Sequence, residues 1–260
     1  MNELLQAARE MALKAGKLLK EYWVRGVEVE YKGEINLVTE ADRASEALIL
    51  SEIRRRFPDH SIVAEESAPK QVPGEFCWYV DPLDGTTNFA HKLPYFSVSI
   101  GVRRGQEMVA GVIYDPILEE LFCAARGEGA TCNDRLIRVS PQKNLGESLL
   151  VTGFNYTIRQ DSGQVFEHFR NFTMVAQGVR RVGSAALDLC YVACGRYEGF
   201  WERDLSPWDT AAGTLLVEEA GGRVTQFGGE PFDLYGAEVL ASNSLIHETM
   251  TEVLRRPHHK

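Results

Sequence analysis

The sequence lacks any long apolar run of the kind that an apolar helix needs to cross a membrane, about 18 residues or more. Its N-terminal segment also lacks the unbroken apolar stretch of a secretory signal, because charged residues recur through it. These are Glu3, Arg9, Glu10, Lys14 and Lys17. We therefore expect a cytoplasmic protein without a membrane partner.

Cysteine is scarce, with five residues in a chain of 260. An odd number in a chain of this size argues against a disulfide framework. Cys190 and Cys194 lie four positions apart in an apolar helical pattern, and no other Cys or His pair completes a zinc site with them. We interpret both as core residues.

Positive charge is also in deficit, since 28 Lys and Arg residues stand against 37 Asp and Glu residues, for a net charge of −9. This balance argues against a broad nucleic-acid interface. The acidic excess either covers the surface or gathers in part into a carboxylate cluster that binds cations. The composition, 44% hydrophobic and 25% charged, is typical of a globular protein.

The first half of the chain predicts two helices followed by strands. Apolar residues recur every three or four positions over residues 2–23 and again over 44–57, as in amphipathic helices. Residues 60–67 and the apolar run 76–80 predict short buried strands. Short segments separate the alternating strands of 97–130, which favours an antiparallel meander.

The pattern changes beyond Pro141, where strands and helices alternate. We expect strands in 147–154, 197–202 and 237–243 and helices in 161–172, 183–195, 206–222 and 244–255. The chain therefore divides into two α+β halves, residues 1–143 and 144–260.

The stretch DPLDGTTNF, residues 81–89, carries the strongest chemical signal. Asp81 and Asp84 can direct two carboxylates toward one point, and the carbonyl of Leu83 offers a third oxygen, the ligand type that Mg²⁺ prefers. Gly85 leaves the backbone open, and a helix that begins at Thr86 would favour an anion at its N-terminus. Cations beside an anion pocket are the layout of phosphate chemistry.

Other acids stand at strand ends or helix starts. Glu65 and Glu66 follow a strand, and Asp42 and Asp209 each open a helix. Each has a simpler explanation, because the helix acids fit capping boxes with Thr39 and Ser206 and the glutamates fit a solvated loop.

Five segments taken together resemble the inositol monophosphatase family: LVTEAD (37–42), AEES (64–67), DPLDGTTNF (81–89), RRVGSAALDLCYVACG (180–195) and PWDTAAGTLLVEEAGG (207–222). The resemblance covers nearly the whole chain in order. It implies a layered α-β-α-β-α sandwich and Mg²⁺-dependent hydrolysis of a phosphomonoester, with two or three ions per site.

The resemblance also implies roles for individual residues. Glu65, Asp81 and the Leu83 carbonyl would hold one metal, Asp81, Asp84 and Asp209 a second, and Glu65 would support a weaker third. Thr86 and Glu65 would position and activate water, with Asp42 orienting Thr86, and the backbone of Gly85 and Thr86 would bind phosphate. The substrate's hydroxyls would contact Gly183, Ser184, Ala185 and Glu202, with Asp84 and Asp209 sharing that task.

Two positions depart from the family pattern: Asn36 replaces a common Asp, and Ser184 replaces the Thr of animal members. Neither selects a substrate. The leading expectation is myo-inositol 1-phosphate or a close relative. Alternatives are fructose 1,6-bisphosphate, histidinol phosphate, NADP and 3′-phosphoadenosine 5′-phosphate, or a regulatory protein that binds the transcription machinery or RNA.

The resemblance further implies a homodimer and inhibition by lithium. Arg180 and Arg181, just before the Gly183–Ala185 segment, would reach substrate or a dimer partner, or form a solvated strand end.

Overall fold

The computed structural model describes residues 3–26, 29–31, 37–67, 74–156, 158–159 and 162–256, so Asn36 lies outside the described residues. Among the described residues, no helix is both long and apolar enough to span a membrane.

The N-terminal half forms two long helices and a seven-stranded sheet. The helices are α1 (Glu3–Arg25) and α2 (Glu40–Arg56). The sheet has the order β3-β4-β5-β6-β7-β8-β9, in which β3 runs parallel to β4 and all later neighbours are antiparallel. Its strands are β3 (Ser61–Ala64), β4 (Phe76–Asp84), β5 (Ser97–Arg104), β6 (Glu107–Asp115), β7 (Glu120–Ala125), β8 (Gly129–Cys132) and β9 (Arg135–Leu136). The predicted antiparallel meander is thus confirmed.

Three short elements complete this half. Strands β1 (Val29–Tyr31) and β2 (Leu37–Thr39) form an antiparallel pair, and α3 (Thr86–Ala90) follows β4. Helix α2 begins four residues earlier than the apolar pattern indicates, because Thr39 and Asp42 form a capping box at its start.

The C-terminal half forms a five-stranded sheet of order β11-β10-β12-β14-β13 with four α-helices. The strands are β10 (Leu149–Thr152), β11 (Gly178–Arg180), β12 (Gly199–Arg203), β13 (Arg223–Thr225) and β14 (Glu238–Ser242). The α-helices are α4 (Gly163–Thr173), α5 (Ala185–Ala193), α6 (Pro207–Glu219) and α7 (His247–Leu254), and a 3₁₀ turn, η1 (Leu145–Glu147), precedes β10. The sequence pattern did not predict the short strands β11 and β13.

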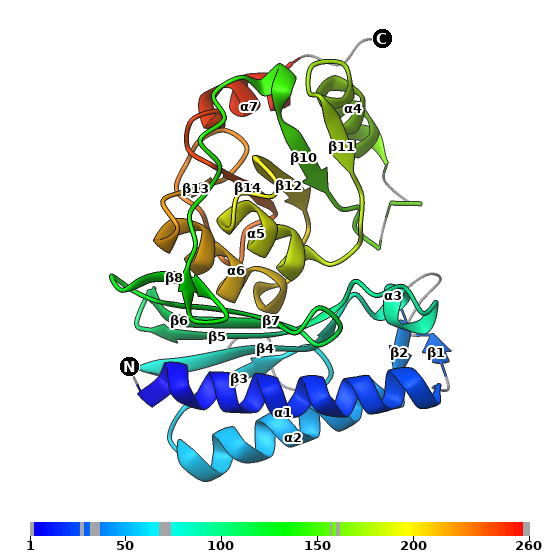
Figure 1. Ribbon diagram of the computed structural model, residues 1–260, viewed down its shortest axis with the longest axis vertical. Helices are drawn as coiled ribbons and strands as arrows, with labels where there is room; N and C mark the ends of the chain where they lie inside the picture. The colour runs from blue at the N-terminus through cyan, green and yellow to red at the C-terminus, as the bar shows by residue number, and fades with distance from the viewer. Residues whose placement is uncertain are drawn as a thin grey trace.

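The helices and sheets stack in five layers (Figure 1). Helices α1 and α2 cover one face of the large sheet, and α5 and α6 lie between the two sheets. Helices α4 and α7 cover the outer face of the small sheet. The expected α-β-α-β-α sandwich is therefore confirmed.

Two glycines bring α6 close to the large sheet. Gly101 of β5 and Gly111 of β6 are register partners, and both face α6. A Cβ at Gly111 would lie 2.9 Å from the carbonyl oxygen of Ala212, and one at Gly101 would lie 2.9 Å from the Cβ of Ala211. No residue larger than glycine fits at this spacing. The two glycines therefore determine how closely α6 packs on the large sheet, and so where its N-terminus lies relative to the end of β4.

Candidate active site

The DPLDG turn sits at the end of β4. The pairing of β4 with β5 shifts register between Asp81 and Asp84, and the Leu83 amide donates a 3.0 Å hydrogen bond to Asp81 Oδ1. Gly85 has φ +89°, a left-handed conformation that favours glycine. A Cβ at residue 85 would also lie 3.0 Å from the Tyr95 carbonyl oxygen. The backbone conformation and the packing at this residue therefore both require glycine. Helix α3 begins at Thr86, as predicted.

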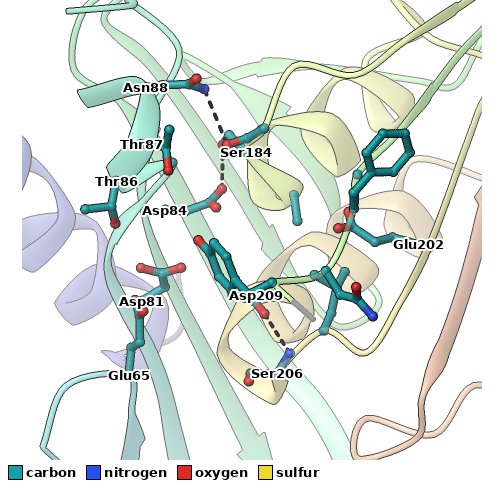
Figure 2. A pocket seen from close by; sticks show the side chains of 18 of the residues that line it. Glu65, Asp81, Asp84, Thr86, Thr87, Asn88, Ser184, Glu202, Ser206 and Asp209 are labelled. Atoms are coloured by element: carbon teal, nitrogen blue, oxygen red, sulfur yellow. Dashed lines mark hydrogen bonds between the residues drawn. The ribbon is translucent and has the colours of Figure 1, made fainter. Parts of the chain in front are cut away.

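A cavity of about 310 Å³ opens beside this turn, between the end of the large sheet and the N-termini of α5 and α6. Every residue that the sequence proposed for the site lines this cavity except Asp42: Glu65, Asp81, Leu83, Asp84, Gly85, Thr86, Gly183, Ser184, Ala185, Glu202 and Asp209. Figure 2 shows Glu65, Asp81, Asp84 and Asp209 around one end and Glu202 across from them. Glu66, by contrast, does not line the cavity.

Asp42 lies buried behind Thr86. Its Oδ2 accepts hydrogen bonds from the Thr39 amide at 2.8 Å and the Thr39 hydroxyl at 2.6 Å, while its Oδ1 lies 3.1 Å from Thr86 Oγ1. Burial raises the pKa of Asp42 to about 6, and the Thr39 hydrogen bonds only partly offset it. Asp42 therefore both caps α2 and accepts a hydrogen bond from Thr86, so the two interpretations of this residue are compatible.

Asp84 is held by the first turn of α5. Its Oδ2 accepts hydrogen bonds from the Ser184 hydroxyl and, at 2.9 Å, from the Ala186 amide. Burial raises the pKa of Asp84 to about 6, although the Ser184 and α5 amide hydrogen bonds act in the opposite direction. Residues 100 or more positions apart thus fix this carboxylate.

Asp209 approaches the same space from α6. Its Oδ2 accepts a 2.6 Å hydrogen bond from the Ser206 amide, which completes the predicted capping box. Burial raises the pKa of Asp209, and the charges of Asp84 and Glu65 raise it further. The pKa of Asp81 is raised by burial and then by Glu65, Asp84 and Asp209. The four carboxylates therefore repel one another across one cavity.

The carboxylates are not drawn together into a closed metal cage. Within the described ranges, no three His, Cys, Asp or Glu side chains are gathered closely enough to hold an ion as they stand. One oxygen of Asp84 and one of Asp209 are turned to hydrogen-bond partners on α5 and before α6. The donor set nevertheless fits hard divalent cations, because it consists of oxygen ligands whose mutual repulsion such ions would relieve.

The opposite end of the cavity is formed by β12 and the segment after β10. Glu202 is buried, and burial together with Asp188 raises its pKa while Arg181 lowers it. A Cβ on Gly153 would lie 2.1 Å from Glu202 Oε2, so the carboxylate rests directly against the Gly153 backbone. The guanidinium of Arg181 lies over the Phe154 ring at 5.4 Å and lines the cavity, whereas Arg180 does not line it.

Sequence reasoning missed several lining residues. They are Thr87, Asn88, Gly153, Phe154, Asn155, Tyr156, Asp204, Leu205, Ser206 and Trp208. For Arg181, which also lines the cavity, the sequence left three roles open. The one signal that could have found Gly153–Tyr156 is their place directly after a buried strand, where ligand crevices form. Trp208 both packs against Tyr79 and lines the cavity.

All five cysteines are free thiols. Cys190 is buried in α5 and Cys194 is half-buried at its end, both within the apolar core between the sheets. Their interpretation as core residues is confirmed.

A family model described as "Inositol monophosphatase family" matches residues 1–259 of the chain. The chain is 48% identical over 252 residues to an inositol-1-monophosphatase of Synechocystis, covering 96% of this chain and 88% of that one. It is 42% identical to the Nus factor SuhB of Escherichia coli, covering 98% and 97%. The solved inositol monophosphatase of Anabaena superposes with a TM-score of 0.88 at 48% identity, covering 96% of this chain and 94% of that one.

Proposed function

Since the chain belongs to the inositol monophosphatase family and is therefore a phosphoric monoester hydrolase, we propose that it hydrolyses myo-inositol 1-phosphate or a closely related polyol phosphate with Mg²⁺. The observation that carries this proposal is a single cavity that combines four carboxylates and the Gly85 turn at one end with the buried Glu202 at the other. The name of the 48%-identical relative supports the substrate class.

Two or three Mg²⁺ ions would occupy the acidic end of the cavity. Glu65, Asp81 and the Leu83 carbonyl would hold one ion, and Asp81, Asp84 and Asp209 another, with Glu65 supporting a third. When bound, the ions would offset the charge of the phosphate, lower the pKa of water and stabilise the leaving oxygen. The backbone amides of Gly85 and Thr86 would bind the phosphate.

Thr86 would orient the attacking water together with Glu65. Its hydroxyl lies 3.1 Å from both Asp42 Oδ1 and the Leu83 carbonyl, and it can donate to only one acceptor at a time. When it donates to Asp42, a lone pair of Thr86 remains to accept a hydrogen bond from water. Asp42 therefore sets the direction of the Thr86 hydroxyl, and Thr86 acts as an orienting group and not as a covalent nucleophile.

The leaving group would lie at the Glu202 end. Glu202 would bind the substrate's hydroxyls together with the backbone of Gly183 and Ala185 and the side chain of Ser184. Because Ser184 also holds Asp84, the same short segment would position substrate and acidic ligand. This arrangement favours a small polyol, since the cavity of about 310 Å³ has polar groups at both ends.

The test is phosphate release by the full chain with Mg²⁺ and with a chelator, across myo-inositol 1-phosphate, fructose 1,6-bisphosphate, histidinol phosphate, NADP and 3′-phosphoadenosine 5′-phosphate. We expect chelator-sensitive release, fastest for the inositol ester, and loss of release in Asp81→Asn. Another preferred ester would change the substrate but keep the chemistry. No release from any ester, with Asp81→Asn unchanged in Mg²⁺ binding, would refute the enzyme proposal.

A regulatory role is the second candidate, because a 42%-identical relative is named a Nus factor. Binding of the full chain to RNA or transcription proteins, unaffected by Asp81→Asn, would favour that role. We also propose a cytoplasmic homodimer that lithium inhibits. Light scattering tests the oligomer and the phosphate-release assay tests lithium.

A further inference from the structure

Tyr95 and Asp188 join the two halves of the chain beside the cavity. The Tyr95 hydroxyl donates a 2.8 Å hydrogen bond to Asp188 Oδ1 across 93 positions of sequence. Tyr95 lies between α3 and β5, and Asp188 lies in the first turn of α5 with only 1% of its surface exposed. Within the described part of the chain, Asp188 Oδ2 has no hydrogen-bond partner. Among the described residues, the hydrogen bond from the Tyr95 hydroxyl therefore links this buried acid to the N-terminal half.

The backbone of Tyr95 is packed against the turn at Gly85 and Thr86, which we call the phosphate turn because its amides would bind phosphate. Its carbonyl accepts a 2.8 Å hydrogen bond from the Asn88 side chain, which also donates to the Val182 carbonyl at 2.9 Å. The same Tyr95 carbonyl lies 3.0 Å from the Cβ position of Gly85. The position of Tyr95 is thereby fixed relative to the turn that begins α3.

The Asp188 end of the link belongs to the segment that holds Asp84. The Ser184 hydroxyl and the Ala186 amide both donate to Asp84 Oδ2, and Asp188 follows within the same helical turn. A shift of this turn relative to β4 would move both donors away from Asp84. The orientation of Asp84 therefore depends on what fixes the first turn of α5.

We propose that Tyr95 and Asp188 are a positioning pair that sets the first turn of α5 against the phosphate turn, and so sets Asp84 for Mg²⁺. This inference rests on the proposed function, because it assigns Asp84 to the metal site. Neither residue lines the cavity, so neither touches substrate or metal. A purely structural pair would lower stability without changing the affinity for Mg²⁺.

The test measures Mg²⁺ binding by isothermal titration calorimetry of the full chain, with thermal melting recorded in parallel. The variants are Tyr95→Phe, Asp188→Ala, Asp188→Asn and the Tyr95→Phe/Asp188→Ala double variant. Tyr235→Phe is the matched control, because it removes the 2.9 Å hydroxyl pair between Tyr79 and Tyr235, which also joins the two halves but lies away from α5.

We expect Tyr95→Phe and Asp188→Ala each to weaken Mg²⁺ binding about tenfold, the low end for groups that orient metal ligands. The double variant should be no weaker than either, because one link is lost in all three. Asp188→Asn should bind Mg²⁺ like the wild type, since the amide oxygen still accepts from Tyr95. Tyr235→Phe should change melting only.

Equal Mg²⁺ affinity in all variants, with only their melting lowered, would overturn the pairing role. Loss in Asp188→Asn equal to that in Asp188→Ala would overturn it as well, because the charge and not the link would then matter. Failure of the wild type to bind Mg²⁺ would instead refute the proposed function.

Discussion

Thr86 Oγ1 lies 3.1 Å from Asp42 Oδ1, although 44 positions separate the two residues in sequence. The other oxygen of Asp42 is occupied by the Thr39 amide and hydroxyl. One carboxylate therefore caps α2 with one oxygen and directs the Thr86 hydroxyl with the other. Capping of α2 and the orientation of the Thr86 hydroxyl are coupled through a single side chain.

Replacing Asp42 with Asn should lower kcat roughly a hundredfold, the usual range for a positioned acid–base group, with little change in KM. Because Thr39 donates to one side of position 42, the Asn carbonyl would take that side and its amide would face Thr86. The amide would then donate to Thr86 Oγ1 and occupy the lone pair that water needs. Steady-state kinetics with saturating Mg²⁺ measure the effect.

Thr39→Ala is the control for this prediction. It removes the hydroxyl that caps the Ala41 amide at 3.1 Å and donates to Asp42 Oδ2, while the amide of residue 39 still donates to that oxygen. It should cost about 1 kcal/mol of stability while kcat stays within about twofold. A kcat loss as large as that of Asp42→Asn would show that helix stability, and not the Thr86 contact, controls the rate.

Mg²⁺ should raise the melting temperature of the protein, because it relieves the repulsion among Glu65, Asp81, Asp84 and Asp209. At a hundred times the dissociation constant, the stabilisation is about 2.7 kcal/mol, or roughly 5–10 °C for a chain of this size. Melting in Mg²⁺ and in NaCl of equal ionic strength measures it. An unchanged melting curve would contradict the shared site.

Asp81→Asn should raise the melting temperature of the metal-free protein and abolish the Mg²⁺ shift. The substitution removes one of four buried like charges, whose repulsion is reflected in the raised pKa of Asp81. Melting curves with chelator measure the metal-free melting temperature, and melting curves with Mg²⁺ measure the shift. A lower metal-free melting temperature would show that Asp81 stabilises the fold by other contacts.

His247 should make the protein acid-sensitive. Burial lowers the pKa of His247 from 6.5 to about 4. Its Nδ1 lies 2.8 Å from Ser242 Oγ, whose oxygen accepts from the Ser244 amide and whose hydrogen can be donated to the ring. Its Nε2 lies 2.9 Å from Thr225 Oγ1, whose hydrogen is donated to the Gln226 carbonyl. The neutral ring with hydrogen on Nε2 therefore satisfies every contact, and a proton on Nδ1 would break one.

The direction in which pH changes the stability follows from this lowered pKa of His247. Above pH 6.5 the His247 ring is neutral in the folded and the unfolded protein, so its full contribution to the free energy of unfolding is present. As the pH falls toward about 4, the ring is protonated in the unfolded protein but stays neutral in the folded one, and this contribution is lost. The loss is about 3 kcal/mol across that window. Urea unfolding of the wild type and of His247→Gln at pH 7, 5.5 and 4 measures it. Equal pH slopes in the two proteins would contradict the prediction.

Gly153→Ala should raise KM, because the new Cβ would lie 2.1 Å from Glu202 Oε2 and displace that carboxylate. Loss of one hydrogen bond to a charged group corresponds to about a ten- to hundredfold fall in kcat/KM. Kinetics on the preferred ester, with Glu202→Gln for comparison, test this. Gly178→Ala controls for the loss of a glycine, because Gly178 has no positive φ, does not line the cavity, and its added Cβ would meet only the ends of the Arg180 and Leu149 side chains, at 3.3 and 3.4 Å.

The sequence by itself determined the features that depend on neighbours in the chain. The acidic turn of Asp81 and Asp84, the open backbone at Gly85 and the capping boxes at Thr39 and Ser206 all follow from local backbone chemistry. The amphipathic period of α1 and the alternation of β5 likewise required no knowledge of the fold. The resemblance across five segments then placed Asp42, Glu65 and Asp209 at one site.

Only the tertiary structure decided which distant atoms meet. Three contacts join residues that lie 44 to 93 positions apart in sequence. Thr86 is hydrogen-bonded to Asp42, the Glu202 carboxylate lies against Gly153, and Tyr95 is hydrogen-bonded to Asp188. Such contacts depend on how closely α6 packs on Gly101 and Gly111 and on where α5 begins against the end of β4. Side-chain packing between layers sets these distances to within an ångström, and no periodicity along the chain encodes them.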